Sequence, residues 1–380
     1  MTAEREVVGL ERCGAYKLEE VQASMKKTLD HIGGIGKFIS KTDSVLLKPN
    51  LLSAKTPDET VTTHPVFVEA IIMLLKEHGI KKIGIGDSPA IDSTEKALKM
   101  SGLQDVCERH GVKMHSFKDS ETVHREENRI VKKFNIAKEV SAYSKMINLP
   151  KMKTHSFTMY TGATKNIFGC ISGTSKALFH VRHRHPLEFS EMLLDLYETV
   201  QPDLSIMDGI IGMEGDGPAG GEARRFGVII TGRDAIAVDR CAIGIMGLKR
   251  VPLLIAARKR YWEKRAEDIK ILGENIKSVK AKNVKSPQGS LLSGASGLMG
   301  TIHRATARRP EVIPESCISC GKCDKVCPAD AIHMEDKTKR LPVFDYKKCI
   351  RCYCCHEVCP VKAIALRRHI LSMPSLLSRP

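Results

Sequence analysis

Two short cysteine-rich segments near the end of the chain constrain its fold more than any other feature. Each has the spacing C-x2-C-x2-C-x3-C-P, and the second follows the first by 32 residues. The sequences that follow them, "CPADAI" and "CPVKAI", also match, so the segments are a duplicated unit. The cysteines are Cys317, Cys320, Cys323 and Cys327 in the first segment and Cys349, Cys352, Cys355 and Cys359 in the second.

This spacing is typical of iron-sulfur clusters. Three closely spaced thiolates hold three corners of one [4Fe-4S] cube, and the fourth cysteine, redirected by its proline, ligates the other cube. The first predicted ligand set is Cys317, Cys320, Cys323 and Cys359, and the second is Cys349, Cys352, Cys355 and Cys327. The alternative is a pair of structural zinc sites, which usually combine two distant cysteine pairs.

Residues 311–368 resemble the bacterial-type two-cluster ferredoxins. The resemblance implies a small α+β domain that transfers one electron at a time. Cys354 lies outside the repeat and is not expected to be a ligand. Six apolar residues are placed to shield the clusters from water: Ile318, Val326, Ile332, Ile350, Val358 and Ile364. Four isolated cysteines are expected in the core instead: Cys13, Cys107, Cys170 and Cys241.

The first 280 residues alternate short β-rich runs with helix-period segments, which is typical of a layered α/β domain with a largely parallel sheet. Strands are predicted in "VVGLER", "SVLLKPN", "KKIGIGDSP", "SKMINLPKMKTH", "DLSIMDGIIG" and "RFGVIITG". Helices are predicted in "KLEEVQASMKKTLDHI", in "HPVFVEAIIMLLKEHG" and over residues 186–200 and 234–246. The predicted divisions are the α/β domain at 1–280, a linker or flap at 281–310, the ferredoxin-like domain at 311–368 and a tail at 369–380.

Several predicted strands end in polar side chains. Carboxyl ends of parallel strands line the ligand crevice of α/β sheets, so these residues form a candidate site. They include Lys48, Asn50, Asp87, Lys151, Lys153, His155 and Asp208. The alternative is that proline, asparagine, aspartate and serine simply form turns at these ends, although lysine and histidine are not turn formers.

Two neighbouring segments add possible anion contacts. In "TGATKNIFG", Thr161, Gly162 and Thr164 open a predicted helix whose free N–H groups face an anion, with Lys165 alongside. The "HVRHRH" segment, residues 180–185, either holds phosphates or is a solvated basic surface. "GDGPAG", residues 215–220, has the dinucleotide glycine spacing but precedes a strand, so it is interpreted as a glycine-rich loop near a ligand.

The segments "LLKPNLL", "TTHP", "GIGDSP", "LPKMKTHSFTMYTGATKNIFG", "DGIIGMEGDGPAGG" and "DAIAVDR" together resemble the domain of unknown function 362 family over roughly residues 40–250. The resemblance implies an α/β iron-sulfur protein, and members look like flavin-dependent redox proteins of anaerobic metabolism. It carries over these site candidates: Lys48, Asn50, Asp87, Lys153, His155, Lys165, Asn166, Asp208 and Glu214. Thr164 joins them from the predicted helix opening.

The predicted function is that of an iron-sulfur electron-transfer protein or oxidoreductase. Clusters move single electrons whereas a flavin converts them to pairs, so FMN or a related flavin is the expected second cofactor. The expected partners are a redox protein such as a ferredoxin and a small-molecule electron donor or acceptor. Alternatives are a non-catalytic electron carrier or scaffold, or an iron-sulfur nucleic-acid binder.

The nucleic-acid alternative rests on charge. The formal net charge is +16, and two oxidised clusters with their eight thiolates lower it to about +12. However, only 5% of residues are aromatic and no nucleic-acid-binding signature occurs, so this alternative is disfavoured. The charged N-terminal sequence and the absence of a long apolar run predict a cytoplasmic protein without a membrane span.

Overall fold

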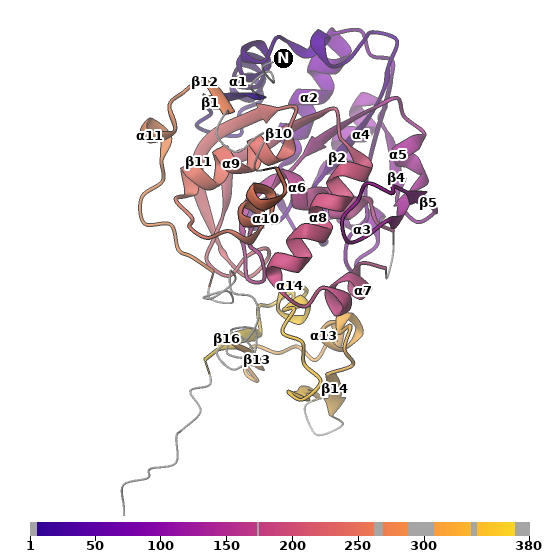
Figure 1. Cartoon of the computed structure of the whole chain (residues 1–380), viewed down its shortest axis with the longest axis vertical. Helices are drawn as coiled ribbons and strands as arrows, with labels where there is room; N and C mark the ends of the chain where they lie inside the picture. The colour runs from indigo at the N-terminus through magenta and orange to yellow at the C-terminus, as the bar shows by residue number, and fades with distance from the viewer. Residues whose placement is uncertain (1–5, 173–174, 262–268, 288–307, 336–339, 369–380) are drawn as a thin grey trace, which may run out of the picture.

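A ten-stranded sheet forms the centre of the chain in the computed structural model (Figure 1). The structure describes residues 6–172, 175–261, 269–287, 308–335 and 340–368. Eight strands follow one another in the order β12 (Ile269–Gly273), β1 (Glu6–Arg12), β11 (Glu222–Gly232), β10 (Leu204–Glu214), β7 (Lys145–Leu149), β2 (Ser44–Pro49), β3 (Lys82–Asp87) and β4 (Lys113–Ser116). These neighbours are parallel except at β11, which is antiparallel to β1 and β10. The predicted α/β fold with a largely parallel sheet is confirmed.

Shorter strands complete the sheets. β8 (Lys151–His155) continues directly from β7 and pairs with β10 and with β9 (Met159–Thr161). Within "SKMINLPKMKTH" the strand ends at Leu149 before Pro150, as expected, and Lys151–His155 form a further strand that was not predicted. The remaining pairs are β5 (Ser120–His124) with β6 (Lys133–Ala137), β13 (Arg309–Val312) with β16 (Ile364–Arg367), and β14 (Ile332–Glu335) with β15 (Leu341–Phe344).

Helices cover both faces of the large sheet. Val45 and Leu47 of β2 pack into one apolar core, whereas Leu46 packs into another, as expected when side chains alternate between faces. The first face is covered by α1 (Leu18–His31), α2 (Pro65–Glu77), α3 (Thr94–Met100) and α4 (Leu103–His110). The other is covered by α6 (Ala163–Asn166), α8 (Pro186–Val200), α9 (Ala235–Met246) and α10 (Pro252–Tyr261). Shorter helices are η1 (Ile35–Lys37), η2 (Pro57–Glu59), α5 (Lys138–Ser141), η3 (Ile167–Cys170), α7 (Ser175–Arg182) and α11 (Ile276–Val279).

The helix ends explain why the sequence predicted these helices well. Helix α2 begins after His64, whose Nδ1 accepts a hydrogen bond from the backbone N–H of Val66 at 3.2 Å, and Pro65 occupies the first helical position. Helix α8 begins with the same His-Pro pair. Gly79, with φ of +98°, follows the end of α2, a backbone conformation that favours glycine. The bounds of α8 and α9 match the predicted ranges closely.

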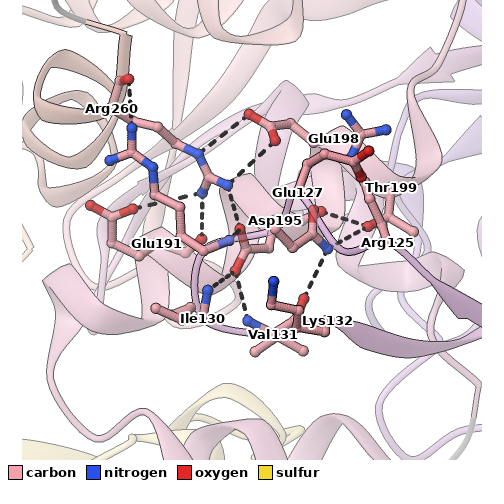
Figure 2. A network of polar contacts seen from close by, with 12 residues as sticks. Arg125, Glu127, Ile130, Val131, Lys132, Glu191, Asp195, Glu198, Thr199 and Arg260 are labelled. Carbon is pink, nitrogen blue, oxygen red and sulfur yellow. Dashed lines mark hydrogen bonds and ion pairs between the residues drawn. The ribbon is translucent and has the colours of Figure 1, made fainter.

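A buried charge network joins α8, α10 and the turn before β6 (Figure 2). Asp195 of α8 accepts hydrogen bonds from the backbone N–H groups of Arg129, Ile130 and Val131 at 2.8–2.9 Å. Its carboxylate also pairs with the guanidinium of Arg260 from α10. The network therefore fixes three segments that are far apart in the sequence.

The cysteine-rich region, residues 308–368, lies at one end of the α/β region in Figure 1. It contains the small ladders β13–β16 and β14–β15 and the short helices α13 (Lys322–Val326) and α14 (Cys354–Glu357). The predicted small α+β domain is confirmed, whereas the exact domain divisions stay a prediction. Residues 288–307 of the predicted linker and the predicted tail at 369–380 lie outside the described residues. No helix in the described part of the chain is long and apolar enough to cross a membrane.

Candidate functional site

A buried ion pair lies at the carboxyl ends of β2 and β3. Lys48 Nζ and Asp87 Oδ1 are 2.8 Å apart, and Asp87 also accepts a hydrogen bond from the backbone N–H of Leu51 at 2.8 Å. Gly169 of η3 lies directly against this pair. A Cβ atom at position 169 would lie only 1.9 Å from Asp87 Oδ1, so glycine is required for this close approach. The two charges compensate each other within the wall of the site.

A chain of amide side chains holds Lys153 of β8 beside this pair. Lys153 Nζ donates to Asn50 Oδ1 and to the carbonyl oxygen of Val61, both at 2.7 Å. Asn50 Nδ2 donates to Asn166 Oδ1 at 3.1 Å, and Asn166 Nδ2 donates to Asn148 Oδ1 at 2.8 Å. Lys153 is therefore positioned by neutral acceptors, which orient its ammonium group without cancelling its charge.

The ion pair and the amide chain both border a cavity of about 180 Å³ between the α/β region and the cysteine-rich region. The α/β region contributes Asn50, Asp87, Lys153, Thr161, Lys165, Asn166, Lys176, His180 and Pro218 to its lining. The cysteine-rich region contributes Lys325 and Val326 of the α13 segment and Cys354, Glu357 and Val358 of the α14 segment. The crevice predicted at the carboxyl ends of the strands is thus closed by the cysteine-rich region.

A larger hollow, about 890 Å³, lies at the C-terminal end of α8 and includes Arg260 and Glu198 among its lining residues. These groups already pair with each other, with Arg260 Nε 3.3 Å from Glu198 Oε1. The lining of the hollow also includes Tyr261, the last described residue before the gap at 262–268. The strand-end cavity is therefore the stronger candidate site.

Burial strongly perturbs the cationic groups of the cavity. It lowers the pKa of Lys153 well below the usual value for lysine, and the neighbouring Lys165 lowers it further. Burial also lowers the pKa of Lys165, an effect opposed by Glu357. The pKa of Lys176 falls to about 8 and that of His180 to about 3, in both cases chiefly because of burial. Clustered groups with shifted pKa values in a cavity are typical of functional sites.

We expect Lys176 to titrate near pH 8. Its pKa is lowered from 10.5 to about 8 on folding, so between these values the folded chain binds fewer protons than the unfolded chain. The contribution of Lys176 to the free energy of unfolding therefore rises with pH across this window and is unfavourable below it. The pH profile of its reaction with an amine-acylating reagent, followed by peptide mass spectrometry, should have its midpoint near 8. The exposed side chain of Lys99 is measured in the same digest as the control for reagent activity and peptide recovery.

His155 of β8 connects the two regions. Its Nδ1 accepts hydrogen bonds from the backbone N–H groups of Phe157 and Thr158 at 3.1 and 3.4 Å, so the proton of the neutral ring lies on Nε2. Nε2 lies 3.4 Å from Glu357 Oε1 of α14. Burial lowers the pKa of His155 and raises that of Glu357. The predicted site residue His155 therefore lies behind the cavity, against the helix that carries Cys355.

The predicted anion site at the start of α6 is filled by the chain itself. The backbone N–H groups of Ala163 and Thr164 donate to the two carboxylate oxygens of Asp239 at 2.6 and 2.8 Å. Tyr160 also donates to this carboxylate, at 2.8 Å. Burial raises the pKa of Asp239 to about 6, although these hydrogen bonds oppose the shift. The expectation of free N–H groups here was wrong, because the distant Asp239 provides the anion.

Two other predicted site residues lie away from the cavity lining. Asp208 Oδ2 is 2.8 Å from Lys151 Nζ, and its Oδ1 accepts a hydrogen bond from Tyr16 at 2.7 Å in a separate buried cluster. Glu214 accepts a hydrogen bond from the backbone N–H of Lys285 at 3.1 Å. Among the predicted candidates, the cavity brings together Asn50, Asp87, Lys153, Lys165 and Asn166, with Lys48 paired behind them.

The eight repeat cysteines fall into two sets of four around two small cavities. One cavity is lined by Cys317, Cys320, Cys323 and Cys359. The other is lined by Cys327, Cys349, Cys352 and Cys355. Each set contains three cysteines of one repeat and the last cysteine of the other, which is the grouping expected from the spacing. Their role as cluster ligands stays a prediction.

The environment of these thiols suits metal-bound thiolates. Burial raises the pKa of Cys355, and the neighbouring thiols Cys352, Cys349 and Cys327 raise it further, so four thiolates are unfavourable here without a compensating positive charge. Backbone N–H groups also point at several of the sulfurs. Those of Ala331 and Ala363 lie 3.2 and 3.1 Å from Cys327 Sγ and Cys359 Sγ, and that of Ser319 lies 3.4 Å from Cys317 Sγ. Such hydrogen bonds tune the potential of a bound cluster.

The second repeat is anchored in the α/β region, and the first is more exposed. Tyr353 packs into the apolar core around Phe157 and Phe189, and His356 Nε2 lies 3.2 Å from the carbonyl oxygen of Asp216. In the first repeat Cys320 is exposed. Ile318, predicted to shield a cluster, is 59% exposed beside it. Ile318 nevertheless lines the cavity of that cysteine set, so its role in shielding a cluster stays a prediction.

Sequence reasoning missed the cavity residues that come from packing between regions. Glu357 and Cys354 lie in the second repeat, for which the sequence pattern predicted cluster ligands and no cavity residues. Cys354 is within hydrogen-bonding distance of Cys352, so it joins the cavity to the second cysteine set. Lys176 and His180 are contributed by α7, and only His180 fell in a segment considered for anion binding. The isolated cysteines are buried as predicted: Cys13, Cys107, Cys170 and Cys241.

The comparisons with known proteins agree with this architecture. Residues 45–244 match the family described as domain of unknown function DUF362, and residues 316–363 match the 4Fe-4S dicluster domain. A curated relative, the thylakoid-associated protein sll1697 of Synechocystis, is 32% identical over 255 residues, which are 67% of this chain and 78% of the relative. Among solved structures, the lactate racemase apoprotein of Thermoanaerobacterium thermosaccharolyticum has a TM-score of 0.43 and 12% identity. That alignment covers 63% of this chain and 57% of the racemase chain, a likeness too distant to support any argument. This chain is thus a 4Fe-4S iron-sulfur protein that belongs to the domain of unknown function 362 family.

Proposed function

We propose that this protein transfers electrons between a redox partner protein and a small molecule held in the cavity between its two regions. The observation that supports this most strongly is the shared wall of that cavity. Helices α13 and α14 contain Cys323 and Cys355, which line the two cysteine cavities, and the same helical segments line the strand-end cavity through Val326 and Glu357. When bound, [4Fe-4S] clusters would supply one-electron transfer between the partner and the cavity.

The thiol sets support this cofactor assignment. We assign Cys317, Cys320, Cys323 and Cys359 to one cluster and Cys349, Cys352, Cys355 and Cys327 to the other. Thiolates are the usual ligands of such clusters. In the strand-end cavity, Lys153, Lys165 and Lys176 attract negative charge, and the chain of asparagine side chains orients Lys153.

The cavity does not fit the flavin expected from the sequence. Its volume of about 180 Å³ is below the roughly 300–1,000 Å³ typical of sites for larger organic ligands. The space lined by the described residues is smaller than a tricyclic isoalloxazine with a ribityl phosphate usually occupies. We therefore assign no step to a flavin. The cytoplasmic location and the ferredoxin-like partner stay predictions.

The exposed side of the first repeat is the proposed contact for the partner protein. Ile318 and Val361 are 59% and 39% exposed and lie with Cys320 around the same cysteine cavity. Electron transfer requires close approach to a cluster, and this is the cysteine set with an exposed member. We expect Ile318→Asp to slow reduction by an acidic ferredoxin about tenfold, because it removes an apolar contact and adds a like charge. The measurement is stopped-flow absorbance of anaerobically prepared protein.

The matched control is Met100→Asp. Met100 is 41% exposed at the C-terminal end of α3 in the α/β region, so this change adds the same charge away from the cysteine sets. Both variants should retain the iron and acid-labile sulfide of the unmodified protein. Equal slowing of the two variants would remove the proposed contact surface. Failure of the unmodified protein to exchange electrons with any ferredoxin or redox dye would contradict the proposed function itself.

A further inference from the structure

The cavity between the two regions contains more positive than negative charge. Lys48 is compensated by Asp87, but Lys153 donates only to an amide and a carbonyl oxygen. Lys176 donates to the carbonyl oxygen of Ser88. Within the described residues, neither these two lysines nor Lys165 forms an ion pair with a carboxylate.

Among the described residues of the lining, Glu357 provides the one carboxylate besides Asp87. It stabilises the charged form of Lys165 and, to a smaller extent, that of Lys153. Lys153, Lys165 and Lys176 therefore depend on Glu357 and on the already paired Asp87 for negative charge, and Lys325 adds a further lysine to the lining. Burying ammonium groups without full compensation is costly, and bound oxyanions are a common means of compensation. The side chains of the lining therefore do not supply enough negative charge to compensate these lysines, and a bound anion would supply it.

The shape of the cavity limits what this anion can be. Its volume of about 180 Å³ excludes nucleotides and accommodates a small acid. Lys153, Lys165 and Lys176 lie on the α/β side. The cysteine-rich region contributes Lys325 and the apolar side chains of Val326 and Val358. A ligand with an acidic group and a short carbon portion would match both surfaces.

We propose that the cavity binds a small oxyanion, a carboxylate or a phosphate, through the ammonium groups of Lys153, Lys165 and Lys176. This inference rests on the proposed function, since it names the chemical class of the small molecule that exchanges electrons there. Lys165 is the most informative of the three. Its Nζ lies over the ring of Phe168, 5.8 Å from the centroid, and has no hydrogen-bond acceptor among the described residues. Removing its charge therefore changes anion binding without breaking a hydrogen bond of the protein.

The test is calorimetric titration of the anaerobically prepared holoprotein with inorganic phosphate, with succinate and with FMN. We expect one of the two oxyanions to bind with a stoichiometry near one, and Lys165→Met to weaken that binding at least about tenfold. Lys99→Met, which removes an exposed lysine of α3, should leave affinity unchanged. A preference between phosphate and succinate distinguishes the two kinds of acid.

Three outcomes would overturn the inference. The first is that neither oxyanion binds at millimolar concentration, and the second is that Lys165→Met binds the oxyanion as well as the unmodified protein. The third is that FMN itself binds with an affinity that depends on Lys165, because a ligand of that size contradicts a small acid. If Lys165→Met does not retain iron, Lys176→Met replaces it under the same criteria. Reduction by ferredoxin is measured on the same preparation, so absence of anion binding with normal reduction refutes this inference and leaves the proposed function standing.

Discussion

Replacing Cys355 by alanine should lower the iron content from about eight to about four atoms per chain, because one of two [4Fe-4S] clusters loses a ligand. Cys327→Ala should produce the same loss from the same cluster, although Cys327 belongs to the other repeat. Both residues line one cavity with Cys349 and Cys352. Iron and sulfide analysis gives the stoichiometry, and electron paramagnetic resonance of the reduced protein shows which cluster signal remains.

Cys354→Ala is the matched control for this experiment. Cys354 is adjacent to Cys355 in sequence and equally buried, but it lies outside both cysteine sets. Its removal should leave about eight iron atoms per chain. Different remaining signals in Cys355→Ala and Cys327→Ala would contradict the exchange of the fourth ligand between repeats. Zinc in place of iron in the anaerobically prepared protein would contradict both clusters.

Asp195→Ala should lower the free energy of unfolding by about 3–5 kcal/mol, the usual cost of breaking a buried ion pair on one side. The carboxylate accepts three backbone hydrogen bonds and pairs with Arg260, whose side chain is only 2% exposed (Figure 2). Alanine leaves this guanidinium and three N–H groups without their main acceptor. Anoxic chemical denaturation followed by circular dichroism measures the change.

Glu198→Gln tests whether the loss is specific to the buried carboxylate. Glu198 also contacts Arg260, at 3.3 Å, but its side chain is 19% exposed. Glutamine keeps an acceptor oxygen and removes a partly solvated charge, so we expect a loss of about 1 kcal/mol or less. Similar losses for the two variants would show that Asp195 has no special role in joining α8, α10 and the turn before β6.

The elements that sequence predicted well are those with strong local signals. Helices α2 and α8 have His-Pro starts and regular apolar spacing, and the central strands are nearly continuous apolar runs, as in "SVLLKP". The end of β7 before Pro150 was predicted, whereas the strand β8 that follows it was not. The cysteine sets followed from spacing alone, because three ligands of each cluster come from one tight loop.

The site was only partly predictable because its contacts are long-range. Lys153 and Asp87 could be placed at strand ends, since parallel strands end at one edge of a sheet. Nothing local indicates that Asp239 occupies the start of α6, because the two are 75 residues apart. Glu357 lines the cavity because the cysteine-rich region packs on the α/β region. The hydrophobic pattern of the sequence does not predict this packing.

The two-sided lining of the strand-end cavity links assembly to ligand binding. Val326 and Val358 come from one region and Lys153 and Lys165 from the other, so a molecule bound as proposed would contact both. By thermodynamic reciprocity, whatever strengthens adhesion between the regions also tightens retention of the molecule, and the bound molecule strengthens adhesion equally. A molecule in the cavity would then stabilise the contact of the cysteine-rich region with the α/β region. Electron transfer into the cavity would therefore be favoured when the electron acceptor is bound.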